Sequence, residues 1–117
     1  MTRDSSPLRA AKPLSDPVLA EIVRRLVAAY HPTRVYLFGS KARAEAGPDS
    51  DYDLLLVVPD DATAQRRGSR LGYEVLRGTG AAADVLVCTR TYFEERLHLQ
   101  ASLPATVARE GVLLHAA

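Results

Sequence analysis

The chain has 117 residues, a length that suits one domain with one hydrophobic core. Hydrophobic residues make up 47% and charged residues 25% of the chain, which is typical of a globular protein. The net charge of +1 argues against a general nucleic-acid binder, because such a protein needs a basic surface. The longest apolar run, residues 54–58, is too short to span a membrane, and the N-terminus lacks an apolar signal core, so we expect a cytoplasmic protein without a membrane anchor.

The N-terminal part predicts a tail followed by a helix. Residues 1–13 are polar and show no periodicity, so we expect a flexible tail ahead of a single domain over residues 14–117. Asp16 and Pro17 predict a helix start, because an acidic N-cap accepts hydrogen bonds from free amides and proline suits the first turn. Apolar residues then recur at helical spacing and stop before Pro32, since proline disfavours helical conformation in the residue preceding it.

The next stretch predicts two strands with a short helix between them. Residues 35–38 are β-branched and aromatic, which favours a strand. Residues 40–46 contain good helix formers, and residues 47–50 are typical of a turn. Residues 51–58 form the next strand, and its continuous apolar run predicts a buried, central position in the sheet.

The second half predicts alternating helices and strands. We expect a helix from Asp60 and Asp61 to about residue 77, weakened by two glycines and presenting three arginines to solvent: Arg66, Arg67 and Arg70. A partner-docking or nucleotide-contact role for these arginines stays open. A third strand follows at residues 83–87.

The C-terminal part predicts two more helices. Thr91 and Glu94 have the spacing of a capping box for a helix to about residue 101. A second helix starts at Ser102 and ends at Gly111, before a short strand or tail at residues 112–114. The single cysteine, Cys88, excludes an internal disulfide and a multi-cysteine zinc site, and we interpret it as a small core residue.

Three acidic residues stand at the beginnings of apolar strands. Side chains alternate along a strand, so Asp51 and Asp53 point the same way, and Tyr52 between them faces the other side, where we expect it to pack in the core. Asp84 begins the later strand, and if the two strands are neighbours the carboxylates converge. Such oxygen ligands favour Mg²⁺ or Mn²⁺. Three of them can hold two metals about 3.5–4 Å apart, which suits in-line displacement at phosphorus.

A Gly39–Ser40 turn precedes this acidic pair. Glycine lets the backbone approach a phosphate closely, and the amides and hydroxyl that follow can bind phosphate oxygens. Lys41 and Arg43 follow within one turn and could neutralise a triphosphate. The P-loop pattern is absent, so this is a different kind of phosphate site.

These motifs together resemble a known family. Gly39–Ser40, ten residues and then Asp51–Tyr52–Asp53 resemble the signature of the nucleotidyltransferase superfamily that includes DNA polymerase β. The fuller strings, LFGSKAR, SDYDLLLVV and ADVLV, are similar to its small branch, the minimal nucleotidyltransferases, over about half of the chain. The resemblance implies an α/β (α+β) domain with a small mixed β-sheet flanked by helices. Ala44 departs from the family, in which many members have glycine.

The resemblance also implies roles for particular residues. Gly39, Ser40 and Arg43, which occupies the arginine position after the Gly-Ser pair, would contact the nucleotide. Asp51 and Asp53 would bind Mg²⁺, with two ions expected and ATP as the substrate. Asp84 would be the third carboxylate, serving as metal ligand and base.

The resemblance extends to a partner. Many minimal nucleotidyltransferases resemble antitoxins encoded beside an all-helical HEPN ribonuclease toxin, and some transfer AMP from ATP to a tyrosine of that toxin. About thirty residues follow Asp84, too few for a domain that holds a small acceptor, so a partner that brings its own hydroxyl fits the size. We therefore expect an AMP-transferring antitoxin. The alternatives are a non-catalytic antitoxin that neutralises its partner by binding, and a small-molecule nucleotidyltransferase that works with a second subunit.

Overall fold

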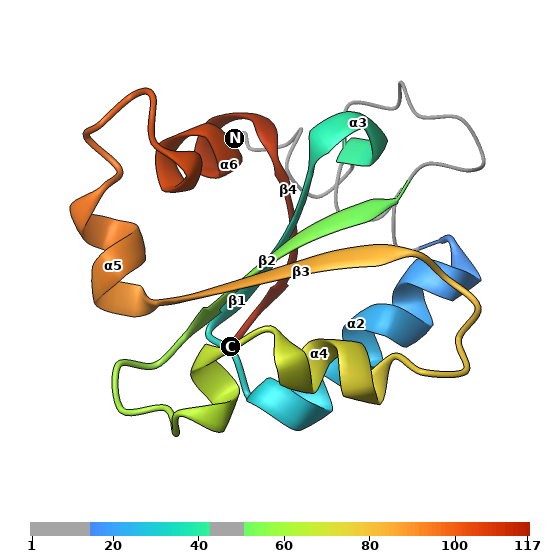
Figure 1. Ribbon diagram of the computed structural model, residues 1–117. Helices are drawn as coiled ribbons and strands as arrows, with labels where there is room; N and C mark the ends of the chain where they lie inside the picture. The colour runs from blue at the N-terminus through green and yellow to red at the C-terminus, as the bar shows by residue number, and fades with distance from the viewer. Residues whose placement is uncertain (1–14, 43–50) are drawn as a thin grey trace.

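A four-stranded mixed sheet separates two groups of helices in the computed structural model, which describes residues 15–42 and 51–117 (Figure 1). The strand order is β3-β2-β1-β4, with β2 and β3 parallel and the other neighbours antiparallel. The expected tail at residues 1–13, the turn at 47–50 and Arg43 lie outside the described residues. The strands are β1 (Arg34–Phe38), β2 (Tyr52–Val58), β3 (Ala83–Thr89) and β4 (Val112–Ala116).

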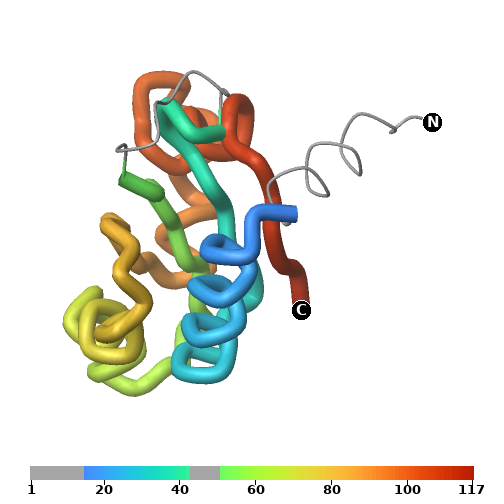
Figure 2. Tube along the Cα trace, turned by 90° about the vertical axis from the view of Figure 1, so that its right-hand side faces the viewer, coloured from blue at the N-terminus to red at the C-terminus, as the bar shows by residue number. Residues whose placement is uncertain are grey.

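Each face of the sheet is covered by two helices. One face packs against α2 (Pro17–Tyr30) and α4 (Arg70–Val75), which lie side by side in both views (Figures 1 and 2). The other face packs against α5 (Arg90–Glu95) and α6 (Leu103–Glu110). The short helix α3 (Gly39–Ala42) follows β1 directly. This arrangement confirms the expected mixed sheet flanked by helices.

Alternation along β2 explains its central place. Leu54, Leu56 and Val58 lie in the larger core cluster beneath α2 and α4. Leu55 and Val57 point to the opposite face and pack with Phe93 of α5. All five side chains are buried, so both faces of this strand are removed from water. The expectation of a central strand is confirmed.

Helix α2 begins and ends where the sequence indicates. The Asp16 carboxylate accepts hydrogen bonds from the amides of Val18 and Leu19, at 2.9 and 3.3 Å. His31 ends the helix in the left-handed region, with φ of 49°, and Pro32 follows. Asp16 therefore satisfies amides that the first turn of a helix leaves without partners.

The long helix expected over residues 60–77 is wrong. A 3-10 turn, η1 (Gln65–Arg67), is separated from α4 by Gly68 in an extended conformation. The Tyr30 hydroxyl explains the break, because it donates to the Gly68 carbonyl at 2.6 Å and accepts from the Gly72 amide at 2.7 Å. These bonds take the place of helical ones.

The arginines of this segment do more than face solvent. The Arg66 side chain donates to the carbonyl of Ala29, and the Arg67 side chain donates to that of Ala62. Arg70 instead forms an exposed ion pair within its own helix, at 3.3 Å from Glu74. Arg66 therefore ties the segment to α2, and Arg67 makes a bond within the segment.

The capping box expected at Thr91 is also wrong. The N-cap of α5 is Thr89, two residues earlier, and its hydroxyl accepts from the Tyr92 amide. Thr91 instead donates its amide and hydroxyl to the Asp60 carboxylate, which was expected to cap a different helix. The expected limits of α6 are confirmed, because Ser102 caps its start and Gly111 its end. Among the described residues, no helix is long and apolar enough to cross a membrane.

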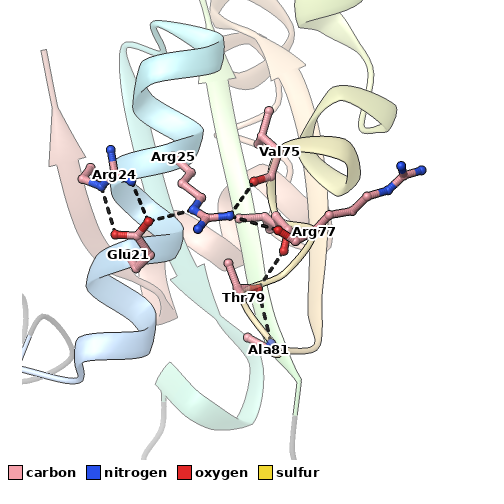
Figure 3. Close-up of polar contacts among 8 residues, drawn as sticks. Glu21, Arg24, Arg25, Val75, Arg77, Thr79 and Ala81 are labelled. Carbon is pink, nitrogen blue, oxygen red and sulfur yellow. Dashed lines mark hydrogen bonds and ion pairs between the residues drawn. The ribbon is translucent and has the colours of Figure 1, made fainter.

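The path of the chain into β3 is fixed by a polar cluster (Figure 3). Arg25 of α2 donates to the carbonyls of Val75 and Arg77, each at 3.1 Å, and so ties α2 to the end of α4. Just beyond, the Thr79 hydroxyl accepts from the Ala81 amide at 3.3 Å. These bonds order the turn that leads into the first residues of β3.

Candidate active site

Two of the three expected carboxylates lie beside each other at one end of the sheet. In the parallel pairing of β2 with β3, Asp53 is the register partner of Asp84. On its other side, Asp53 is paired with Phe38 of β1. Neighbouring strands lie about 4.8 Å apart, and partners in register project from the same face. The condition for convergence, that the two acidic strands be neighbours, is therefore met for Asp53 and Asp84.

Gly39 lies against the Asp53 carboxylate. Its φ is +75°, a conformation that favours glycine. A Cβ atom added there would stand only 2.3 Å from Asp53 Oδ2. Ser40 follows at once as the second residue of α3, and its side chain is partly exposed. A phosphate bound at the Gly39–Ser40 turn would consequently lie next to Asp53.

The electrostatics of this site favour a bound cation. Burial raises the pKa of Asp53, and the negative charges of Asp84 and then Asp51 raise it further. Asp51 itself is exposed, immediately before β2. Across residues 15–42 and 51–117, no three Asp, Glu, His or Cys side chains are gathered as a ready-made metal site. The donor chemistry nevertheless fits a hard divalent cation, because carboxylate oxygens that repel one another gain from a positive charge between them.

Tyr52 and Lys41 face away from this carboxylate pair. Tyr52 packs against the larger core cluster, as expected, and its hydroxyl donates to Asp16 Oδ2 at 2.6 Å. Burial, followed by the bond to Asp16, raises the pKa of Tyr52 to about 12. Lys41 Nζ lies 4.5 Å from the centroid of the Tyr52 ring, so it is engaged there rather than beside Asp53. The bond from Tyr52 to Asp16 joins the start of β2 to the start of α2.

Tyr73 is a member of the site that the sequence did not indicate. Its hydroxyl donates to Asp84 Oδ1 at 3.4 Å and accepts from the Val85 amide at 3.3 Å. Tyr73 lies on α4 and Asp84 on β3, so only the turn between these elements brings them together. No motif or periodicity singles out a tyrosine in such a helix.

Cys88 lies outside this cluster, farther along β3. It is partly exposed and packs against the smaller core cluster, and burial raises the pKa of its thiol to about 11. A thiol with a raised pKa is a poor nucleophile near neutral pH. The structure therefore supports the interpretation of Cys88 as a packing residue.

A mixed sheet that presents paired carboxylates beside a glycine turn is suited to holding a phosphate group with a metal ion. The sequence matches the family model of the nucleotidyltransferase domain over residues 18–113, and the chain belongs to this family. Domains of this family generally use a nucleoside triphosphate and a divalent metal. No curated protein sequence matches the chain.

Two solved structures share the fold. One is a protein of Sulfolobus solfataricus described as a candidate nucleotidyltransferase, with 22% sequence identity and a TM-score of 0.55 over 96% of this chain and 87% of that one. The other belongs to a toxin–antitoxin structure with AMP-PNP, with 16% identity and a TM-score of 0.51 over 83% of this chain and 73% of that one. At these identities the similarity shows the fold alone.

Proposed function

We propose that this protein is a Mg²⁺-dependent nucleotidyltransferase that transfers AMP from ATP to a hydroxyl of a partner protein. One observation carries the proposal: the Gly39 turn, Asp53 and Asp84 follow one another across the end of the sheet. The triphosphate would bind at one end of this row, and the acceptor hydroxyl would approach the other.

Each part of the row has a separate task in this proposal. The backbone at Gly39 and the Ser40 hydroxyl would bind phosphate oxygens, because glycine lets the backbone approach a phosphate closely. A Cβ atom at this position would crowd Asp53. Asp53 and Asp84, with Asp51 nearby in sequence, would hold the divalent cation, which neutralises charge on the triphosphate when bound. Asp84 would also take the proton of the acceptor hydroxyl. Arg43, outside the described residues, remains a candidate for neutralising phosphate charge.

The proposed partner is a HEPN-type toxin, with this chain as its antitoxin. The motif resemblance supports this partner, and one fold neighbour comes from a toxin–antitoxin structure that contains AMP-PNP.

Co-expression with the neighbouring gene product, followed by intact mass of both chains, tests the proposal. We expect the partner to gain whole AMP units when it is made with the wild-type protein. The Asp53→Asn variant should leave it unmodified, and the matched control Asp61→Asn, an exposed acid outside the row, should modify it normally. A partner that binds tightly and stays unmodified would show neutralisation by binding alone and overturn the transferase proposal.

A further inference from the structure

A hydroxyl of the protein itself already occupies the acceptor end of the site. Tyr73 Oη donates to Asp84 Oδ1 at 3.4 Å, and Asp84 is the group proposed to receive the acceptor proton. We infer that Tyr73 is a nucleotidyl acceptor in cis, so that the protein transfers AMP from ATP to its own Tyr73 when no partner is bound. This inference rests on the proposed function and adds a modification site to it.

The topology allows Tyr73 to reach Asp84. Strand β3 is one of the two edge strands of the sheet, so a side chain of α4 can pass its free edge and reach the Asp84 carboxylate. The Val85 amide donates to Tyr73 Oη at this edge. The order across the site is therefore Gly39, Asp53, Asp84 and then the Tyr73 hydroxyl. A triphosphate held at Gly39 and the Tyr73 hydroxyl would flank the carboxylate pair, and the α-phosphorus would have to lie between them, within reach of the hydroxyl.

The backbone that carries Tyr73 is held in place. Gly72 packs so closely against β3 that an added Cβ would lie 2.9 Å from a methyl group of Val85. The Gly72 amide donates to the buried Tyr30, and Arg25 binds carbonyls at the end of the same helix (Figure 3). Tyr73 itself is 46% exposed. A fixed backbone with an accessible hydroxyl favours reaction, because orientation lowers the entropic part of the barrier.

An open hollow lies on the surface beside Tyr73. A hollow of about 350 Å³ is lined by Tyr73 together with Ser69, Arg70, Glu74 and Arg77. Arg70 of this lining is paired with Glu74, so the Arg77 guanidinium is the group that suits the negative charge of a phosphodiester attached to the Tyr73 oxygen.

The reaction balances without a further reagent. Tyr73 Oη attacks the α-phosphorus of ATP, and a phosphorus–oxygen bond forms between them. The bond from the α-phosphorus to the oxygen bridging to the β-phosphate breaks, and pyrophosphate leaves with the electron pair. The phenolic proton passes to the Asp84 carboxylate and then to water. The product is a tyrosyl-AMP ester on α4 and free pyrophosphate.

The test uses the purified full chain with ATP and MgCl₂ and no partner. We expect the intact mass to rise by one AMP unit, and peptide mapping to place it on the peptide that contains Tyr73. Tyr73→Phe should abolish the gain. The matched control is Tyr92→Phe, which removes a hydroxyl from a side chain of the same 46% exposure on α5, and it should gain mass like the wild type.

A folding control and the persistence of transferase activity make the result decisive. Circular dichroism of Tyr73→Phe should show the wild-type spectrum, so that loss of the modification reflects the missing hydroxyl. Wild-type protein with no added mass, or AMP on another residue, overturns the inference. If Asp53-dependent pyrophosphate release or partner modification persists under either result, the transferase function stands and only the self-acceptor role of Tyr73 fails.

Discussion

Replacing Gly39 by alanine tests the phosphate end of the site. The substitution has two effects that the structure separates. A side chain at φ of +75° is strained, at a cost of about 1–2 kcal/mol. The new Cβ also meets Asp53 Oδ2 at 2.3 Å, whereas ordinary contact begins at 3.4 Å, so the carboxylate must move by about 1 Å. It is the end of a flexible side chain, so the move costs little stability but misplaces the proposed metal ligand.

Gly80 provides a matched control. Its φ is +74°, and a Cβ added there meets nothing within 4 Å. Gly80→Ala therefore carries the backbone strain without the collision. We expect both variants to lose similar stability, roughly 4–8 °C in melting temperature. Only Gly39→Ala should lose transfer, by about 100-fold, because a displacement of about 1 Å at a reacting centre costs that much.

Thermal melting and the rate of pyrophosphate release from ATP with Mg²⁺ measure the two effects. The reasoning is refuted if Gly39→Ala and Gly80→Ala keep equal rates, because the contact between Gly39 and Asp53 would then have no part in the reaction. Equal loss of rate in both variants would refute it as well, since backbone strain alone would then explain the effect.

Three other substitutions test separate parts of the account. Asp53→Asn should abolish transfer and melt at or above the wild-type temperature, because burial and the neighbouring acids already disfavour the Asp53 charge. A variant that fails to fold would show that this carboxylate has a structural role instead. Asp84→Asn should slow single-turnover transfer far more than it weakens ATP binding by calorimetry, and equal losses would make Asp84 an ordinary ligand of the nucleotide-bound metal. Asp16→Ala should lower the free energy of unfolding by about 1 kcal/mol in urea at neutral pH. The hydrogen bond from Tyr52 lowers the pKa of Asp16 below its ordinary 3.8. The difference in unfolding free energy between wild type and Asp16→Ala should therefore be full above pH 3.8 and shrink as the pH falls through the lowered pKa. A difference that persists at low pH would contradict the role of the Asp16 charge.

Local chemistry accounts for the parts of the fold that the sequence predicted well. Asp16 and Ser102 cap helices through hydrogen bonds to amides two or three residues away. The residues that form each cap are therefore close in sequence, where a local pattern can indicate them. The continuous apolar run of β2 likewise predicts burial on both faces of the strand, because consecutive side chains point to opposite faces. The sequence also placed Asp53 and Asp84 near the beginnings of two strands, but only the structure shows that these strands are neighbours.

Long-range contacts account for the errors. The Tyr30 hydroxyl interrupts the helix expected after Asp60, and it comes from a residue 38 positions before the Gly68 carbonyl that it binds. Asp60 caps nothing nearby because Thr91, 31 positions later, donates to it. Tyr73 joins the site for the same reason, since its bond to Asp84 exists only after α4 has packed on the sheet. Secondary-structure propensity and local residue spacing do not indicate hydrogen-bond partners that are distant in sequence.

The fate of the α-phosphate of ATP tests the central claim most directly. The protein and its co-expressed partner are incubated with Mg²⁺ and ATP labelled on either the α- or the γ-phosphate, and protein-bound label is measured after denaturation. We expect α-label to become covalently attached, γ-label to leave as pyrophosphate, and Asp53→Asn to abolish the attachment. Covalent γ-label would show phosphoryl transfer instead, and the absence of any protein-bound label would contradict transfer to a protein hydroxyl.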